Sequence, residues 1–268
     1  MPVFTLKSLS LALILAGMSQ CALAAPLLSV VTPAAPGYEQ PQPSNSWLEI
    51  DRQAFENNIA RLQQQLAGKT QLCAVMKADA YGSGIALLIP SAIKMGVGCI
   101  GVTSNEEARI ARAEGFKGRL MRLRTATLPE IEYALPYDMD ELVGNLQVAR
   151  KIDLLAASTG KKVRVHLALN SSGMSRNGIE MSTPQGKAQA VEITRLPHLN
   201  LVGIMTHFPV EEREDVLKGL SVFKDQSAWL INEAKLDRSK LLLHCANTFT
   251  TLQVPEGWLD MVRPGAAL

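Results

Sequence analysis

Short apolar segments recur along the chain, separated by polar or amphipathic stretches. Between several of them, apolar residues return at helical spacing, as in Asn105–Glu114 and Thr183–Thr194. Alternation of short strands with helices is the pattern of parallel βα units. The predicted strands are 72–77, 99–103, 120–123, 141–144, 163–169, 201–206, 241–246 and 261–263.

Eight strands of this kind favour one fold. They fit a TIM (β/α)8 barrel better than a doubly wound sheet, which usually has fewer strands. Asp51 is placed to cap a first helix that runs to about Leu66, and residues 47–50 predict a short strand before it. We therefore expect an α/β protein whose barrel domain covers residues 47–268.

The first 46 residues differ in composition from the rest. Residues 1–24 have the features of a signal peptide: Lys7 near the start, an apolar run over residues 9–16, and a small-x-small cleavage site at Ala22-Leu23-Ala24. The apolar run is too short to span a bilayer, and an uncleaved anchor is the alternative. Residues 25–46 are rich in proline and predict a surface linker. We expect a periplasmic protein without a membrane segment.

Charge and composition exclude some classes of function. With 27 Lys and Arg against 25 Asp and Glu, the formal net charge is +2, and no basic run carries interleaved aromatic residues. We expect no nucleic-acid partner and assign no metal ligands. The hydrophobic share of 47% is that of a globular protein, so a small molecule is the expected ligand.

Removal of the signal peptide leaves three cysteines, of which Cys245 is one. Cys73 and Cys99 each lie near the start of a predicted strand, and the two strands follow one another in the chain. Consecutive parallel strands are usually neighbours, so these thiols should form a disulfide in an oxidising compartment. Two small buried thiols are the alternative.

A lysine ends the first predicted strand, where an apolar residue or a turn is normal. Cys73, Val75 and Lys77 share one face of this strand, so the lysine should point into the barrel. Partial desolvation at the mouth of the barrel would favour its neutral amine, a nucleophile able to form a Schiff base. A lysine whose amine simply reaches water is the alternative.

The ends of the last two predicted strands carry suitable donors for a phosphate group. Asn247 and Thr248 follow the seventh strand, and Gly265 and Ala266 follow the eighth. Loops at these two places form the phosphate sites of many TIM barrels, and a glycine allows the backbone to approach closely. A Schiff-base lysine with a phosphate site indicates pyridoxal 5'-phosphate or a sugar-phosphate aldolase.

Arg263, just before that site, separates the two possibilities. An arginine at the ring nitrogen of pyridoxal phosphate would keep the nitrogen unprotonated, because a guanidinium does not give up its proton. Such a ring is a weaker electron sink and favours simple proton exchange at the α-carbon. An arginine that donates to a loop carbonyl is the alternative.

Five motifs resemble those of the alanine racemase family, and they occur in the same order. A-V-M-K-A-D-A-Y-G-S-G at residues 74–84 resembles the family's pyridoxal-lysine signature, with Ser83 at a position that is usually histidine. The other four are G-M-S-R at 173–176, T-H-F at 206–208, H-C-A-N-T at 244–248 and D-M-V-R-P-G at 260–265. The resemblance extends over residues 47–268.

The resemblance implies a role for each matching residue. Lys77 would be the Schiff-base lysine and one of two racemisation bases, and Arg263 would face the pyridine nitrogen with support from His207. Arg176 would contact the substrate carboxylate and the phenolic oxygen of the cofactor. His166, in the fifth strand, is expected to be a core residue. The residues that would hold the cofactor phosphate are Tyr81, Asn247, Thr248, Gly265 and Ala266.

One region departs from ordinary alanine racemases. The lysine of those enzymes, often carbamylated and then negatively charged, and their aspartate before G-M-x-R fall here on Ala168 and Asn170, so two anionic groups are missing. Arg122 and Arg124 end the third predicted strand and should lie nearby. From this charge balance we expect a bound chloride near Arg176.

This variant, the signal peptide and the cysteine pair together are similar to the periplasmic broad-specificity amino-acid racemases. That resemblance implies racemisation of basic and small aliphatic amino acids by a homodimer. Family members continue past the last motif into a β-domain whose tyrosine is the second base, in the partner's site, whereas this sequence stops at Leu268. Residues 47–50 would pair with that domain, and we expect weak or absent racemisation, and doubtful dimerisation, from this chain alone.

Three other functions compete with this interpretation. A narrow alanine racemase would share all five motifs. A non-catalytic pyridoxal-phosphate-binding barrel needs no second domain, but it would lack the export signal. A periplasmic amino-acid-binding protein has no use for a desolvated lysine.

Overall fold

The computed structural model describes residues 47–174 and 176–268. The predicted signal peptide, 1–24, and linker, 25–46, lie outside the described residues. Glu49–Leu268 form one compact unit, which is the subject of this section.

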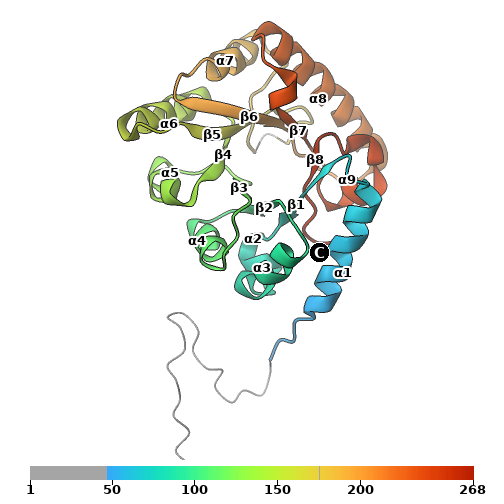
Figure 1. Cartoon of the computed structure of the whole chain (residues 1–268). Helices are drawn as coiled ribbons and strands as arrows, with labels where there is room; N and C mark the ends of the chain where they lie inside the picture. Colours follow the sequence, from blue (N-terminus) through green and yellow to red (C-terminus); the bar gives the residue numbers. More distant parts are fainter. Residues whose placement is uncertain (1–46, 175) are drawn as a thin grey trace, which may run out of the picture. The chain divides into compact units, whose positions relative to one another are not determined.

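The unit is built around a ring of parallel strands (Figure 1). Within the described residues the strand order is β7-β6-β5-β4-β3-β2-β1-β8. Strands β1 to β7 thus lie side by side in chain order, and β8 lies beside β1. The ring nearly closes between β7 and β8, where Ala246 and Val262 form a single bridge. The TIM-barrel prediction is confirmed. The strands are β1 Gln71–Val75, β2 Cys99–Val102, β3 Arg119–Arg122, β4 Met139–Val143, β5 Val163–Ala168, β6 Leu199–Met205, β7 Leu242–His244 and β8 Met261–Val262.

Helices surround this ring (Figure 1). The helical segments are α1 Arg52–Leu66, α2 Lys77–Tyr81, α3 Ile85–Lys94, α4 Asn105–Ala113, α5 Leu128–Ala134, α6 Leu146–Thr159, α7 Pro184–Thr194, α8 Arg213–Glu233 and α9 Thr248–Gln253. Of these, α2 is a short turn whose residues 78–81 have positive φ. Short 3-10 turns are η1 Leu135–Tyr137, η2 Arg238–Lys240 and η3 Pro255–Gly257.

The helices begin where the sequence supplies capping side chains. The carboxylate of Asp51 accepts a hydrogen bond from Ala54 N at 3.0 Å, as predicted for the start of α1. Ser104 and Glu107 form a reciprocal capping box at α4. These side chains satisfy backbone N–H groups that have no partner inside the helix, which fixes the first turn of each helix.

Residues 47–50, predicted to be a strand that pairs with a further β-domain, have no regular secondary structure within the described part of the chain. A strand is stabilised by hydrogen bonds to a neighbouring strand. Within the described part of the chain, the eight-stranded sheet does not include them. The pairing of residues 47–50 with a further domain therefore stays a prediction.

The core has an outer and an inner part. Most buried apolar side chains lie in two large clusters of sheet and helix residues. A smaller cluster contains Cys73, Cys99, Met121 and Met261, which belong to β1, β2, β3 and β8. Cys73 and Cys99 are register partners in the β1–β2 pair and form a disulfide, which confirms the prediction. A disulfide is consistent with a location outside the cytoplasm.

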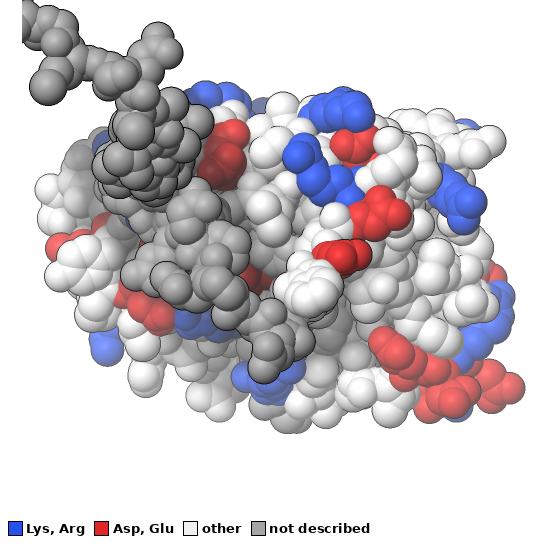
Figure 2. Space-filling model, turned by 90° about the horizontal axis from the view of Figure 1, so that it is seen from below, with Lys and Arg blue, Asp and Glu red and all other residues white. Residues whose placement is uncertain are grey.

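The face of the molecule drawn in Figure 2 carries basic and acidic side chains interspersed. No broad single-sign patch is seen among its described residues. In residues 47–174 and 176–268, no helix has the length and apolar content needed to cross a membrane. The same residues contain no group of three or more His, Cys, Asp or Glu side chains placed to hold a metal ion.

Candidate active site

Lys77 lies two residues beyond the end of β1, not within the strand as predicted. The strand stops because the next residues adopt a left-handed turn, with φ between 52° and 56° from Ala78 to Tyr81. This conformation costs non-glycine residues about 1–2 kcal/mol each. Strain of this kind is characteristic of functional sites, where the surrounding structure holds it in place.

Several hydrogen bonds hold the left-handed turn. The Asp79 carboxylate accepts from Ile85 N at 2.7 Å, and Gly82 N donates to Ala78 O at 2.9 Å. The turn therefore fixes the directions of Lys77 and Tyr81, the residues at its two ends. The Lys77 amine lies 5.8 Å from the centre of the Tyr81 ring.

One cavity of about 240 Å³ opens at the carboxyl ends of the strands. Every residue predicted from the sequence to bind cofactor or substrate lines it. The cavity brings together residues from β1, from the loops after β5 and β6, and from the ends of β7 and β8. Its lining residues are Val75, Lys77, Tyr81, Leu123, Arg176, Asn177, Met205, His207, Glu211, Asn247, Thr248, Arg263, Gly265 and Ala266.

Tyr81, Thr248 and Gly265 form one wall of this cavity. The hydroxyl of Thr248 accepts a hydrogen bond from Gly265 N at 3.0 Å. The Tyr81 ring passes so close to Gly265 that a Cβ atom there would lie 2.3 Å from the tyrosine oxygen. A side chain at 265 would therefore displace the Tyr81 ring from its place in this wall.

Asn247 is more constrained than its place in the sequence predicts. Its Oδ1 accepts from Thr250 N at 2.9 Å and so caps α9. Its Nδ2 donates to Glu211 Oε1 at 3.1 Å. The side chain lines the cavity, but two of its hydrogen bonds are made within the protein.

The cavity is strongly cationic, with Lys77, Arg176 and Arg263 in its walls. Burial lowers the pKa of Arg263 to about 10, so it remains charged at neutral pH. Its Nη2 donates to Thr206 O at 3.1 Å, which is the carbonyl contact that the sequence left open as the alternative. Burial, reinforced by the nearby cations, lowers the pKa of His207 to about 3, so His207 is neutral.

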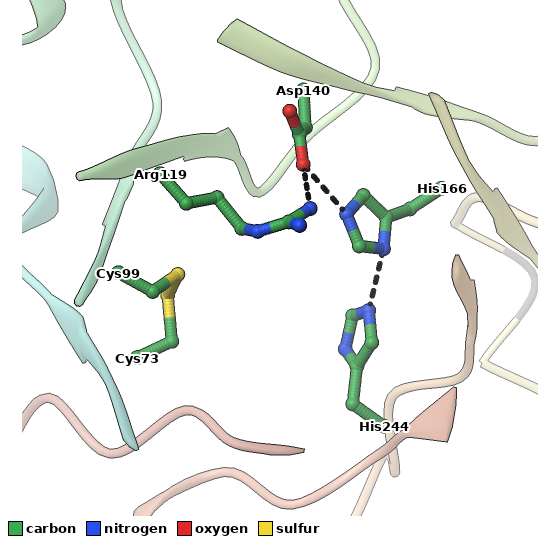
Figure 3. Close-up of a disulfide and its surroundings, with 6 residues drawn as sticks. All are labelled: Cys73, Cys99, Arg119, Asp140, His166 and His244. Atoms are coloured by element: carbon green, nitrogen blue, oxygen red, sulfur yellow. Dashed lines mark hydrogen bonds and ion pairs between the residues drawn. A yellow bond between two sulfur atoms is a disulfide. The ribbon is translucent and has the colours of Figure 1, made fainter. Parts of the chain in front are cut away.

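Polar side chains also lie inside the ring of strands (Figure 3). Asp140 binds Arg119, and its Oδ2 lies 3.2 Å from His166 Nε2. His166 Nδ1 in turn lies 2.9 Å from His244 Nε2. Both histidines are fully buried, as predicted for His166. Gly203 makes room for this chain, because a Cβ atom there would lie 2.2 Å from His166 Nδ1.

The chain fixes the tautomer of each histidine. Burial lowers the pKa of His166 and His244, so both rings are neutral. Because the Asp140 carboxylate accepts from His166 Nε2, His166 Nδ1 must accept from His244 Nε2. His244 Nδ1 is then an acceptor, and neither it nor Arg263 Nε has a partner among the described residues. The positive charge of Arg263 contributes to the low pKa of His244.

Arg122 and Arg124, which we expected near a chloride, have carboxylate partners of their own. Arg122 is fully buried and binds Glu141 at 2.7 Å. Arg124 binds Glu130, and this contact holds the pKa of Glu130 at about 2. These two arginines are therefore balanced within the chain, and the charge argument for an anion rests on Arg176.

Comparison with known families accounts for this arrangement. The family model described as alanine racemase, N-terminal domain, matches residues 50–268. This chain belongs to the alanine racemase family. The five motifs of the alanine racemase family all lie within the matched range.

Relatives in the family carry more specific names. The broad specificity amino-acid racemase of Pseudomonas taetrolens is 57% identical over 265 residues, which are 99% of this chain and 64% of that protein. The lysine racemase of Proteus mirabilis is 46% identical over 236 residues, which are 87% of this chain and 58% of that protein. The chain thus spans less than two thirds of the length of either relative.

A solved structure of the family has the same fold. The alanine racemase of Bartonella henselae, which carries covalently bound pyridoxal phosphate, superposes with a TM-score of 0.69 and 22% identity. The match covers 81% of this chain and 58% of that one. At this level of identity the likeness shows the fold alone.

Sequence reasoning missed some residues that the structure brings to the site. Glu211 and Asn177 line the cavity, and Asp140 organises the histidines inside the ring of strands. Asn177 directly follows the G-M-S-R motif, which is a usable signal. Asp140 is one of two adjacent acidic residues in the strand MDELV, Met139–Val143, and acidic residues in a buried strand are also a signal. Glu211, in an exposed loop with several acidic residues, had none.

Proposed function

We propose that this chain is the cofactor-binding barrel of a pyridoxal-phosphate-dependent amino-acid racemase of broad specificity. The observation that carries the proposal is the single cavity that joins Lys77 to Arg263, Arg176 and the wall formed by Tyr81, Thr248 and Gly265. The names of the Pseudomonas and Proteus relatives favour broad specificity over a narrow alanine racemase.

The cavity fits the cofactor in charge and in shape. Three cations suit a phosphate and a carboxylate. Because residue 265 has no side chain, its backbone lies at the surface of the proposed phosphate site, next to Tyr81. Tyr81, Asn247, Thr248, Gly265 and Ala266 would hold the phosphate. When bound, pyridoxal phosphate withdraws electrons from the α-carbon of an amino acid and so eases loss of its α-proton.

The residues of this chain would perform the remaining tasks. Lys77 Nζ would bond to the cofactor and would carry the α-proton on one face of the substrate. Arg263, charged and buried, would face the ring nitrogen without protonating it, and neutral His207 would support it. Arg176 would bind the substrate carboxylate and orient the α-carbon toward Lys77.

A racemase needs a base on each face of the α-carbon, and Lys77 serves one face. We propose that the second base is a tyrosine in the part of the complete protein that corresponds to the remaining length of the relatives, acting in the site of a homodimer partner. Residues 47–268 would then be the barrel domain, and on their own they would racemise weakly or not at all.

Two further parts of the proposal concern surroundings and location. A chloride beside Arg176 would replace the carboxylate-like groups missing at Ala168 and Asn170. Residues 1–24 would direct the protein to the periplasm, where the Cys73–Cys99 disulfide would persist.

Covalent labelling tests the proposal. The protein from the complete gene is loaded with pyridoxal phosphate, reduced with borohydride and mapped by peptide mass spectrometry. The label should be found on Lys77, and Lys77→Ala should lose it together with about 10²–10⁴-fold of the racemisation rate. Lys69→Ala, at an exposed lysine outside the cavity, should retain both. A label that persists in Lys77→Ala would contradict the proposal.

A further inference from the structure

One group in the cavity opposes the binding of anions. Glu211 is the single carboxylate among the described residues that line it, whereas Lys77, Arg176 and Arg263 are cations. A carboxylate near a phosphate site repels a phosphate, so its presence calls for a separate reason. That reason is either structural or a cation that it binds.

Glu211 has only a minor role in stabilising the fold. It lies in the loop between β6 and α8, and Glu212, not Glu211, is the N-cap residue of α8. Its hydrogen bond from Asn247 Nδ2 is not needed to orient Asn247, because Asn247 Oδ1 already caps α9. Glu211 Oε1 accepts that bond, and no described residue donates to Oε2. The side chain is exposed toward the cavity mouth and can accept a further donor.

The chemistry of the substrate supplies the other reason. An α-amino acid would present its carboxylate to Arg176 and its α-amino group to the region of Lys77, which leaves the side chain to face the remaining walls. A cationic side chain would meet two or three positive charges there and would be repelled. A carboxylate at the rim would attract such a side chain and offset this repulsion.

We infer that Glu211 determines specificity by admitting amino acids with a cationic side chain. Oε2 would accept from the distal ammonium or guanidinium of the substrate while Oε1 stays on Asn247. Uncharged substrates would not use this contact. The inference rests on the proposed function and deepens it by assigning one residue to one class of substrate.

A binding experiment tests this inference without relying on turnover. The complete, cofactor-loaded protein is reduced with borohydride so that no reaction proceeds, and the dissociation constants of L-lysine, L-methionine and L-alanine are measured by calorimetry. Methionine is an unbranched side chain one atom shorter than that of lysine, and it carries no charge. Glu211→Gln should weaken lysine binding about tenfold and leave the other two within about twofold. Glu211→Lys should abolish lysine binding and retain alanine.

Controls separate a direct contact with the substrate side chain from an indirect effect on the cavity. Glu214→Gln removes the same charge from an exposed position in the first turn of α8 and should change none of the constants. Equal weakening of lysine, methionine and alanine by Glu211→Gln would show that Glu211 acts through Asn247, and an unchanged lysine constant would show that it does not bind the side chain. Either result overturns the inference.

Activity distinguishes failure of the inference from failure of the proposed function. With the unreduced protein, kcat/KM for lysine should fall in Glu211→Gln while that for alanine stays the same. If the unsubstituted protein racemised neither amino acid, the proposed function would be wrong, and this inference would fall with it. If it racemised both and Glu211→Gln affected both equally, only the inference would be wrong.

Discussion

At the scale of single residues, Gly265 sets the shape of the cavity wall. Its missing side chain lets the Tyr81 oxygen lie where a Cβ atom would be 2.3 Å away, and its N–H reaches Thr248. The Tyr81 ring can lie against the backbone at 265 because this residue has no side chain. The identity of residue 265 therefore affects the position of Tyr81.

Gly265→Ala should therefore weaken cofactor binding. The added methyl group must displace Tyr81, which breaks the wall, and we expect the dissociation constant of pyridoxal phosphate to rise about tenfold or more. Absorbance titration of the cofactor-free protein measures this constant. Gly98→Ala is a matched control, because a Cβ atom at Gly98 meets nothing within 4 Å. Equal affinity in the two variants would contradict the prediction.

His207 makes stability depend on pH. Its pKa is about 3 in the folded protein and about 6.5 when unfolded, because burial and the nearby cations disfavour its charged form. Between these values the unfolded chain binds a proton that the folded protein does not, so stability is lost as the pH falls. The loss from this residue should be about 2 kcal/mol between roughly pH 7.5 and pH 5.

Urea unfolding of the cofactor-free protein at these two pH values checks this prediction. Between roughly pH 7.5 and pH 5, the free energy of unfolding of His207→Gln should decrease by about 2 kcal/mol less than that of the unsubstituted protein. The reason is that glutamine does not titrate. The other buried histidines contribute equally to both proteins and cancel in the comparison. The same pH dependence in both would show that His207 is protonated in the folded state.

Residue-level prediction succeeded where a local motif carries the information. Lys77, Arg176 and Arg263 were assigned from motifs, and all three line the cavity. The hydrogen bond from Asn247 to Glu211 was not predictable, because Glu211 lies 36 residues away and follows no pattern. Pairings that depend on how two loops meet are set by the tertiary fold.

At the scale of elements, β1 is linked to its neighbours by covalent and hydrogen bonds. The disulfide joins it to β2 at the register pair Cys73–Cys99, and Val75 N donates to Pro264 O just beyond β8. The strand that presents Lys77 is therefore held on both sides. The lysine's position should depend on the integrity of this sheet segment.

Removal of the disulfide should lower stability. The bridge closes a loop over a sequence separation of 26 residues, so its loss in Cys73→Ala/Cys99→Ala should cost about 3 kcal/mol of the free energy of unfolding. Urea or thermal unfolding measures the difference. A reductant should destabilise the unsubstituted protein and leave the double variant unchanged. If the reductant destabilised both by the same amount, the effect would not come from this bridge.

The left-handed turn after β1 shows the limit of pattern-based prediction for elements. The apolar run predicted a strand to Lys77, but β1 ends at Val75. Residues 78–81 read Ala-Asp-Ala-Tyr and contain no glycine, which is the usual signal for positive φ. The turn is held by contacts such as Asp79 with Ile85, which periodicity does not report.

At the scale of the whole molecule, counting apolar segments was sufficient for the barrel. All eight predicted strands exist, with boundaries that differ by at most two residues, because each is a short, mostly buried apolar segment. Residues 47–50 have an apolar pattern too, but a strand also needs a hydrogen-bonded neighbour, and pattern alone does not supply one.

The join between β7 and β8 has a consequence for release of a ligand. This join consists of the Ala246–Val262 bridge and a few hydrogen bonds, among them Arg263 N to Ala246 O at 2.9 Å and Gly265 N to Thr248 at 3.0 Å. Asn247 and Thr248 stand on one side of it, and Arg263 and Gly265 stand on the other. A ligand bound by residues on both sides would connect β7 to β8 in addition to these few bonds. Separation of the two strands and release of the ligand would then occur together.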